Sequence, residues 1–187
     1  MCRNLYFYTS IRNISKIRCF ISEDIAKKLV TTLILSKLDY FNSLFAGVHD
    51  GTLKCLQIAQ NSAARMIKGR RCHITPILRE LHWLPVQMRI KYKICLFVYK
   101  CLNNEAPIYL SSMIEKYVPP RRLRSSEDTT ILVETNYKPT YKIYGCRSFR
   151  FLAPKFWNSL PRSIRESNSV ANFKSNLKHH LFCIYFD

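Results

Sequence analysis

The feature that most constrains the fold of this chain is the spacing of its apolar residues, which recur every three or four positions along most of the sequence. One stripe runs between residues 52 and 68 and contains Leu53, Leu56, Ala59, Gln60, Ala63 and Ile67. A second begins at Val86 and contains Ile90, Ile94, Phe97, Val98 and Cys101. Because an α-helix has about 3.6 residues per turn, each stripe occupies one helical face. The chain is therefore expected to be mainly α-helical, with its helices packed as an irregular bundle.

Polar caps, prolines and a glycine predict where the helices begin and end. Ser22 is a typical N-cap residue, and the acids Glu23 and Asp24 follow it in the first turn, where the helix dipole favours negative charge. Pro85 is expected to open the longest helix, and Gly69 to end the helix that starts near residue 52. The helix after Ser22 is expected to bury Ile25, Leu29, Leu33, Ile34 and Leu38. Shorter helices are expected from Thr75 to Leu81, from Pro107 to Ile114, near Pro154 and after Ser169.

One region departs from this helical pattern. Residues 129–133 and 137–144 are rich in Thr, Ile, Val and Tyr, which favour β-strands, so one small β-hairpin or two short strands are expected near residues 128–144. The sequence VPPRRLR at 118–124 is typical of a linker or an exposed loop. The expected organisation is a helical region at 1–117, a basic, proline-containing linker at 118–127, and the hairpin with C-terminal helices at 128–187.

The charge of the chain is the first indication of a partner. Thirty Lys and Arg against 12 Asp and Glu give a formal net charge of +18. A chain this basic repels itself unless polyanions are near, so nucleic acid is the expected partner. An anionic membrane surface and a merely soluble basic domain are the alternatives. The longest apolar runs are far shorter than the roughly 20 residues that a membrane span needs, so no membrane partner is expected.

The cysteines indicate a compartment. Eight cysteines are scattered along the chain without a Cys-x-x-Cys pair, and reduced thiols in an intracellular protein are the simplest explanation. The N-terminus lacks the apolar run and the small-residue cleavage site of a signal peptide. The expected location is therefore the nucleus or the cytoplasm.

The carboxylates do not form a recognisable catalytic centre. Polymerases and nucleases hold two metal ions with clustered carboxylates. The five aspartates of this chain are dispersed, with no Asp-Asp box: Asp24, Asp39, Asp50, Asp128 and Asp187. The adjacent pairs Glu23-Asp24 and Glu127-Asp128 are better explained as a helix N-terminus and a loop. The chain is therefore expected to have no catalytic residues and not to be an enzyme on its own.

No metal or cofactor site is expected either. His179 and Cys183 are one helical turn apart and would face one metal ion, but a zinc site needs four ligands. No cysteine is marked as a nucleophile by its neighbours. The four glycines are not spaced as a phosphate-binding loop, so no nucleotide cofactor is expected.

Three basic groups are the candidate nucleic-acid contacts, because arginine pairs with phosphate and stacks on bases. Their members are Arg65, Lys68, Arg70, Arg71, Arg121, Arg122, Arg124, Arg147 and Arg150. Tyr137, Tyr141 and Tyr144 lie between the second and third groups, an arrangement that suits single-stranded nucleic acid. The alternative is that these tyrosines fill one face of a small sheet and that the arginines are merely solvated.

Four stretches of the chain resemble the region that follows the polymerase in LINE-type (non-LTR) retrotransposons of the jockey-like group. They are LSKLDYFNSLFAGV at 35–48, LQIAQNSAARMI at 56–67, the stretch 73–114 that begins HITPILRELHWLPV, and the stretch 149–182 that begins FRFLAPKFWNSLP. The sequence RRLRSS at 121–126 lies at the expected place between the last two. The matching order and spacing span almost the entire chain.

The resemblance implies a non-catalytic C-terminal fragment of a polyprotein that carries an endonuclease and an RNA-directed DNA polymerase. The catalytic residues of such polyproteins lie upstream, so no catalytic role is carried over to any residue here. The expected function is binding of RNA or DNA through the basic groups, with the parent polymerase domain as a further partner. The alternative is an inert structural or decayed fragment with no activity of its own.

Three short sequences within these stretches are expected to be structural. Asp39 and Asn42 in LDYFNSLF are candidate helix caps. Trp83 in HWLPV is expected to fill the corner between two helices. In APKFWNSLP, Trp157 and its neighbours Phe156 and Leu160 are expected to anchor the last part of the chain to the core.

Overall fold

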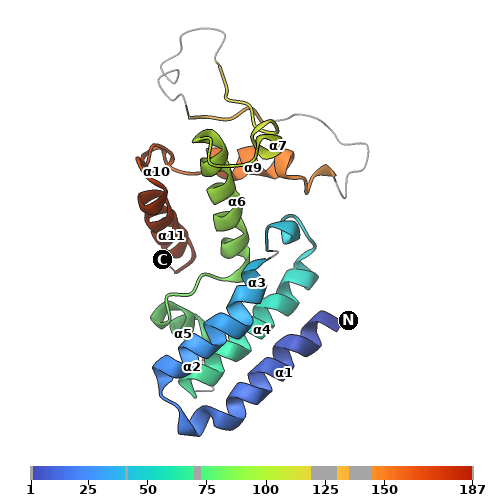
Figure 1. Cartoon of the computed structure of the whole chain (residues 1–187), viewed down its shortest axis with the longest axis vertical. Helices are drawn as coiled ribbons and strands as arrows, with labels where there is room; N and C mark the ends of the chain where they lie inside the picture. The colour runs from blue at the N-terminus through green and yellow to red at the C-terminus, as the bar shows by residue number, and fades with distance from the viewer. Residues whose placement is uncertain (1, 41, 70–72, 119–129, 135–144, 187) are drawn as a thin grey trace. The chain divides into compact units, whose positions relative to one another are not determined.

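A computed structural model describes residues 2–40, 42–69, 73–118, 130–134 and 145–186, and confirms that the chain is mainly α-helical. The chain divides into two compact units (Figure 1). Unit 1 comprises Met1–Ile90 and Tyr185–Asp187, and unit 2 comprises Lys91–Ile184. The division falls inside a helix, after Ile90. The linker expected from the sequence spans residues 118–127. Residues 119–127 of that linker lie outside the described residues.

Unit 1 is built from consecutive helices. They are α1 (Cys2–Ile17), the 3-10 turn η1 (Arg18–Phe20), α2 (Glu23–Val30), the π-helical turn η2 (Thr31–Leu35), α3 (Ser36–Tyr40), the 3-10 turn η3 (Asn42–Phe45), α4 (Asp50–Lys68), α5 (Ile74–Glu80) and the first turn of α6 (Val86–Leu102). Ser22 caps α2 as expected, since its Oγ accepts a hydrogen bond from the N–H of Ile25 at 3.4 Å. The N-terminal signals in the sequence therefore located this helix correctly.

The core of unit 1 forms where α4 packs against α1, α2 and α5. Ala63 and Ala64 of α4 are fully buried, and their small side chains allow a neighbouring helix to approach closely. The expected stripe of α4 is largely confirmed, because Ala59, Gln60, Ala63 and Ile67 are all fully buried. Trp83 is buried in the same cluster, as expected for the corner between α5 and α6.

The buried face of the helix at 23–40 differs from the expected one. Ala26, Val30, Ile34 and Leu38 are buried, whereas Ile25 and Leu33 are exposed. Each residue of the expected stripe from Ile25 to Leu33 is followed directly by another apolar residue, so two adjacent faces of the helix are apolar. The smaller Ala26 and Val30 are the ones that pack into the core. The π-helical turn η2 lies within this helix, where the expected stripe shifted by one residue between Leu33 and Ile34. Ile34 and Leu38 of the expected stripe are buried, and the buried residues keep a spacing of four through this π-helical turn.

Three helices end in a residue with a positive φ. Gly69 has φ 62° after α4, as expected, and His82 (53°) and Asn104 (58°) follow α5 and α6. At His82 the chain closes a Schellman motif, in which the N–H of Trp83 donates to the carbonyl of Leu78 at 2.9 Å. Of these three residues, the sequence predicted only the glycine, because glycine adopts this conformation without steric cost.

Unit 2 contains the remainder of α6 with α7 (Ile108–Ser111), α9 (Phe149–Asn158), α10 (Arg162–Arg165) and α11 (Val170–Phe186) up to Ile184. Its core is aromatic: the ring of Phe173 stacks on Tyr99 with a centroid distance of 4.2 Å and lies 5.8 Å from the ring of Trp157. The hydroxyl of Tyr99 donates to the carbonyl of Ser167 at 2.6 Å. Trp157 and Leu160 are buried, so the anchoring role expected for them is confirmed.

The small β-hairpin expected near residues 128–144 is not present among the described residues, which contain no β-strand. Leu132 forms instead one isolated antiparallel bridge with Lys116. On its other side, the side-chain amide of Asn158 accepts from the N–H of Leu132 at 3.0 Å and donates to its carbonyl at 2.9 Å. This amide therefore occupies both backbone groups that a second strand would use. Residues 137–144, the expected second strand, lie outside the described residues.

Candidate nucleic-acid interface

The nine candidate cations are only partly described. Arg65 and Lys68 lie on α4 in unit 1. In unit 2, Arg147 precedes α9 and Arg150 lies in its first turn. The others lie outside the described residues: Arg70, Arg71, Arg121, Arg122 and Arg124. The structure thus places the four described candidates in two separate groups, each on its own unit.

Lys68 is held by two carboxylates and is only 10% exposed. Its Nζ donates to Oε1 of Glu23 and, at 2.5 Å, to Oε1 of Glu80. The hydrogen bonds to Glu23 and then to Glu80 raise the pKa of Lys68, and the hydrogen bond from Lys68 lowers the pKa of Glu23. Lys68 therefore connects the end of α4 to the start of α2 and to the end of α5. A phosphate would have to displace both carboxylates to bind Lys68.

Arg65 has the exposure that a phosphate contact requires. It is exposed on α4 and forms no ion pair with any residue that the structure describes. Lys54 lies eleven residues earlier on the same helix and is also exposed. Eleven residues are about three helical turns, so the two cations share one face of α4. This face is a candidate contact surface in unit 1.

The two arginines of the third group differ in their availability. Arg150 is exposed, and within the described part of the chain it forms one long ion pair, 3.8 Å from Nη2 to Oε1 of the exposed Glu115. An exposed pair of this kind contributes little, at most about 1 kcal/mol, so a phosphate would displace it readily. Arg147 is half-buried and already has an interaction within the protein. Of the two, Arg150 is therefore the better candidate.

Several other arginines stabilise the fold and are not free to bind a ligand. Arg18 donates from Nε and Nη2 to the carbonyl of Ile67, at 3.2 and 2.7 Å, and so satisfies an end of α4. Arg89 donates from Nη1 to Oδ2 of Asp39 at 2.7 Å. Arg165 donates from Nη1 to the hydroxyl of Thr130 at 2.9 Å. Part of the net charge of +18 thus belongs to arginines that bind groups within the protein. The folded structure, and not the sequence, identifies these arginines.

Asp39 and Asn42 act in the same cluster as Arg89, although they were expected to cap helices. Oδ1 of Asp39 accepts from Nδ2 of Asn42 at 3.3 Å, and Nε of Arg89 donates to the carbonyl of Leu84 at 2.9 Å. Asn42 is buried. The cluster therefore joins the end of α3 to the start of α6 within unit 1.

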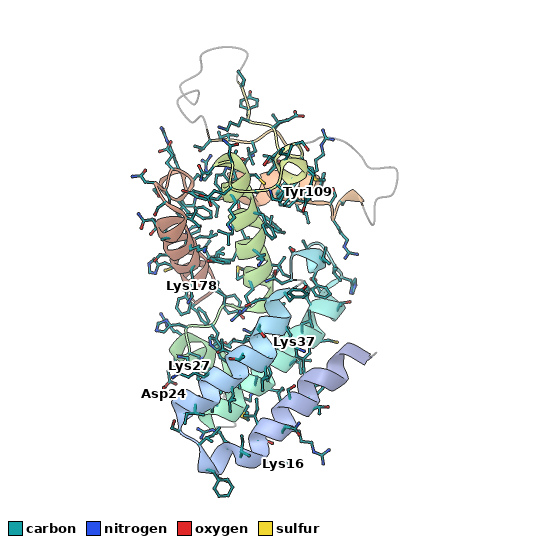
Figure 2. The ribbon with its side chains drawn as sticks, viewed as in Figure 1. Lys16, Asp24, Lys27, Lys37, Tyr109 and Lys178 are labelled. Atoms are coloured by element: carbon teal, nitrogen blue, oxygen red, sulfur yellow. The ribbon has the colours of Figure 1, made fainter. Side chains whose placement is uncertain are left out.

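The helices of unit 2 carry cations that the sequence analysis did not single out. The helices α6, α9 and α11 contain no acidic residue. Their cations within unit 2 are Lys91, Lys93, Lys100, Arg150, Lys155, Lys174 and Lys178. Lys174 and Lys178 are exposed and lie one turn apart on α11, where Figure 2 labels Lys178. The signal was the absence of acids from three long segments, rather than a local run of basic residues.

Two of these lysines lie over aromatic rings. Nζ of Lys155 is 4.0 Å from the centroid of the Phe151 ring, and Nζ of Lys93 is 5.5 Å from that of Phe97. Such contacts orient a lysine side chain and leave its charge unneutralised. These cations therefore remain available to an anion.

Histidine and cysteine side chains among the described residues are the other candidates for a chemical role. No group of three or more His, Cys, Asp or Glu side chains in this part of the chain is placed to hold a metal ion. His179 and Cys183 do lie together, with 3.7 Å between Nε2 and Sγ. Burial raises the pKa of the Cys95 thiol to about 12, which makes it a poor nucleophile. Among the described helices, none has the length and apolar character needed to cross a membrane.

The chain matches no protein-family model, and neither a curated protein nor a solved structure matches it. Its candidate interface therefore rests on its own residues. These are the exposed face of α4 with Lys54 and Arg65, and the cations of unit 2 on α9 and α11.

Proposed function

We propose that this chain is a non-catalytic segment that binds RNA or DNA through exposed basic patches, and that it derives from the region following the reverse transcriptase of a LINE-type retrotransposon polyprotein. The observation that carries the binding proposal is the lack of acidic residues on α6, α9 and α11, which leaves their cations without neutralising neighbours on the same helices. We further propose that the segment acts in the nucleus or the cytoplasm, where its free cysteines would stay reduced.

The charge of unit 2 supports a polyanionic partner. Its described residues contain eleven Lys and Arg but only four acids: Glu105, Glu115, Glu134 and Glu166. Charges closer than the Debye length of about 8–10 Å repel one another in physiological salt. A nucleic acid relieves this repulsion, and the release of its condensed counterions adds a favourable entropy. Binding of this kind is electrostatic and tolerates many sequences.

The origin of the segment remains a proposal based on the four stretches of sequence. Trp83 and Trp157, from two of these stretches, are buried in the cores of units 1 and 2. Asn158, from the same stretch as Trp157, holds the backbone of Leu132. Residues that the resemblance picks out thus contribute to the fold, which agrees with a non-catalytic role. The parent polymerase domain is the further partner that this origin suggests.

The alternative, an inert structural fragment, is favoured by one specific observation. Lys68, Arg18, Arg89 and Arg165 all bind groups within the protein. If every cation of the candidate interface bound a group within the protein in this way, no cation would be available to bind nucleic acid. Measurement of binding against salt distinguishes the two possibilities.

The test uses the full chain, a labelled single-stranded RNA and a labelled duplex DNA, with affinity measured at several salt concentrations. We expect the logarithm of the binding constant to fall linearly with the logarithm of salt. Replacing Arg121, Arg122 and Arg124 together by Ala should lower the slope for single strands by about 2, and Lys174→Ala with Lys178→Ala by about 1.4, because each lost phosphate contact contributes about 0.7. Both variants should weaken binding to every sequence.

The matched control keeps the charge. Lys174→Arg with Lys178→Arg should bind as wild type, since both cations remain on the exposed face of α11. Circular dichroism of each variant checks that folding is intact. Unchanged affinity and unchanged salt slope in both alanine variants would favour the inert fragment instead.

A further inference from the structure

Exposed apolar side chains of unit 2 gather in one short stretch, residues 108–118, called here the 108–118 segment. Among the described residues of unit 2, six large apolar side chains are exposed, and five of them lie in this segment. They are Ile108, Tyr109, Met113, Tyr117 and Val118. A water-exposed cluster of this kind is unfavourable in isolation and marks a surface that meets a partner.

The backbone of the 108–118 segment is held in place although its side chains are exposed. The helix α7 begins after Pro107, and hydrogen bonds from Met113 to Leu110 and from Ile114 to Ser111 continue it as turns. The N–H of Tyr117 then donates to the carbonyl of Ile131 at 2.9 Å. The segment thus presents its side chains from a fixed backbone, which reduces the conformational entropy lost on binding.

Two tyrosines are the planar groups of this surface. Tyr109 is 64% exposed on α7, where Figure 2 labels it, and Tyr117 is 43% exposed beside the bridge between Lys116 and Leu132. A tyrosine ring offers a flat π-face at a low entropic cost, because its side chain has only two rotatable bonds. The unpaired bases of a single strand expose faces of the same kind, whereas a duplex hides them in its stack.

The charges beside the tyrosines suit a phosphate backbone. Lys116 is exposed next to Tyr117, and Arg150 makes a long ion pair with Glu115. Aromatic and cationic groups in one region are the combination found where proteins bind single strands without sequence preference.

We propose that Tyr109 and Tyr117 stack on unpaired bases, so that unit 2 binds single-stranded nucleic acid in preference to duplex. This inference rests on the proposed function and adds the kind of nucleic acid that is bound. Ile108 and Val118 supply apolar contacts beside the bases, and Lys116 and Arg150 bind the phosphates. The cations provide affinity for any polyanion, and the tyrosines provide the preference for single strands.

The test compares two tyrosine replacements in the full chain. Tyr109→Leu with Tyr117→Leu keeps apolar bulk but removes the rings, whereas Tyr109→Phe with Tyr117→Phe keeps the rings and removes the hydroxyls. The probes are an oligouridylate of about 12 nucleotides, which lies within the usual site sizes, and a duplex of the same length at the same salt. The matched control is Tyr8→Leu, which removes a comparably exposed tyrosine from α1 of unit 1.

We expect the leucine variant to bind the single strand about tenfold more weakly for each tyrosine removed, and the duplex within about twofold of wild type. The phenylalanine variant and Tyr8→Leu should bind both probes as wild type does. Equal losses for both probes, or equal losses in the leucine and phenylalanine variants, would overturn the stacking role. So would binding of wild type to phosphatidylserine–phosphatidylcholine vesicles that is lost in the leucine variant while oligouridylate binding is retained.

The failure of this inference is distinguishable from the failure of the proposed function. Wild-type chain that shows no salt-dependent binding to either probe contradicts both. Salt-dependent binding to both probes, unchanged in the leucine variant, contradicts the stacking role alone and leaves the electrostatic binding intact.

Discussion

Units 1 and 2 have similar charge but use it differently. In unit 1 the ion pairs join residues that are far apart in the sequence: Lys68 with Glu23, and Arg89 with Asp39. In unit 2 the pair of Arg162 with Glu166 spans one turn of chain, and the pair of Arg150 with Glu115 is long and exposed. The ion pairs of unit 1 connect different helices, whereas the two pairs of unit 2 leave the arginine side chain at least half exposed. A net charge therefore predicts a partner only when the positions of its cations are known.

The exposed apolar side chains differ between the units in a similar way. In unit 1 they are distributed over α1, η1, α2, η2, α3, η3 and α4, from Tyr8 to Ile58, and include Tyr185 near the end of α11. Scattered exposed apolar residues are normal in proteins and need no partner. In unit 2 they concentrate in the 108–118 segment. The described ion pairs of unit 1 thus join its helices, and the exposed apolar side chains of unit 2 gather in the segment for which we propose a binding role.

The largest expected effect tests whether unit 2 depends on a single side chain. Trp157 is fully buried, lies against Phe173, and donates from Nε1 to the carbonyl of Thr130 at 2.7 Å. Trp157→Ala should lower the free energy of unfolding by about 3–5 kcal/mol, because it leaves a cavity and an unpaired carbonyl. Urea unfolding followed by circular dichroism measures this loss.

The matched variant in unit 1 is Trp83→Ala, which also removes a buried tryptophan. Trp83 forms no side-chain hydrogen bond with any described residue, so its loss should cost less than that of Trp157. A cost for Trp157→Ala below about 1 kcal/mol would show that unit 2 is not organised around this ring.

A smaller effect is expected at the ion pair that joins α3 to α6 in unit 1. Asp39→Asn removes the charge that Nη1 of Arg89 contacts at 2.7 Å, while the amide keeps nearly the same shape. The carboxylate is 41% exposed, so screening by solvent limits the loss to about 1 kcal/mol. The loss should shrink in high salt, and thermal unfolding at low and high salt measures it.

The control for this variant is Glu105→Gln in unit 2, an exposed acid with no ion pair among the described residues. It should leave stability unchanged. A loss for Asp39→Asn no greater than that for Glu105→Gln would remove the distinction between the two uses of charge.

The sequence predicted the elements of the fold better than their faces and partners. The N-cap Ser22, the end of α4 at Gly69 and most of the buried stripe of α4 were all predicted, because each depends on local residue preferences. The buried face of α2 was wrong by one residue, since apolar residues occupy two adjacent faces there and only the packing partner α4 decides between them. The hairpin is not borne out among the described residues, where the side chain of Asn158, 26 residues away, binds the backbone of Leu132.

The candidate site was harder to predict for the same reason. Lys68 belongs to a basic group in the sequence, but Glu23 and Glu80 approach it only in the folded chain. Exposure of Tyr109 and Tyr117 also depends on tertiary structure. The tyrosines chosen from the sequence as candidates for stacking on bases were Tyr137, Tyr141 and Tyr144, which lie outside the described residues. Pairing and exposure are properties of the fold, so charge counts and motifs alone do not determine them.

The last and smallest expected effect is the dependence of stability on pH, which involves a different titrating group in each unit. In unit 2, Nε2 of His180 is buried and has no hydrogen-bond partner among the described residues. Burial, followed by the nearby charges of Lys91 on α6 and His179 on α11, lowers the pKa of His180 below 6.5. In unit 1, the hydrogen bond from Lys68 lowers the pKa of Glu23 below 4.5.

Lowering the pH should reduce the free energy of unfolding through both groups, but over different pH ranges. Each group binds its proton more weakly in the folded than in the unfolded chain, so stability falls as the pH drops from the unfolded pKa through the folded pKa. The loss due to His180 should begin below pH 6.5, and that due to Glu23 only below pH 4.5. His180→Gln should therefore abolish a small decline in melting temperature just below pH 6.5, whereas His179→Gln should retain most of it, because burial is the main cause. A decline that persists in His180→Gln would assign the acid sensitivity to another group.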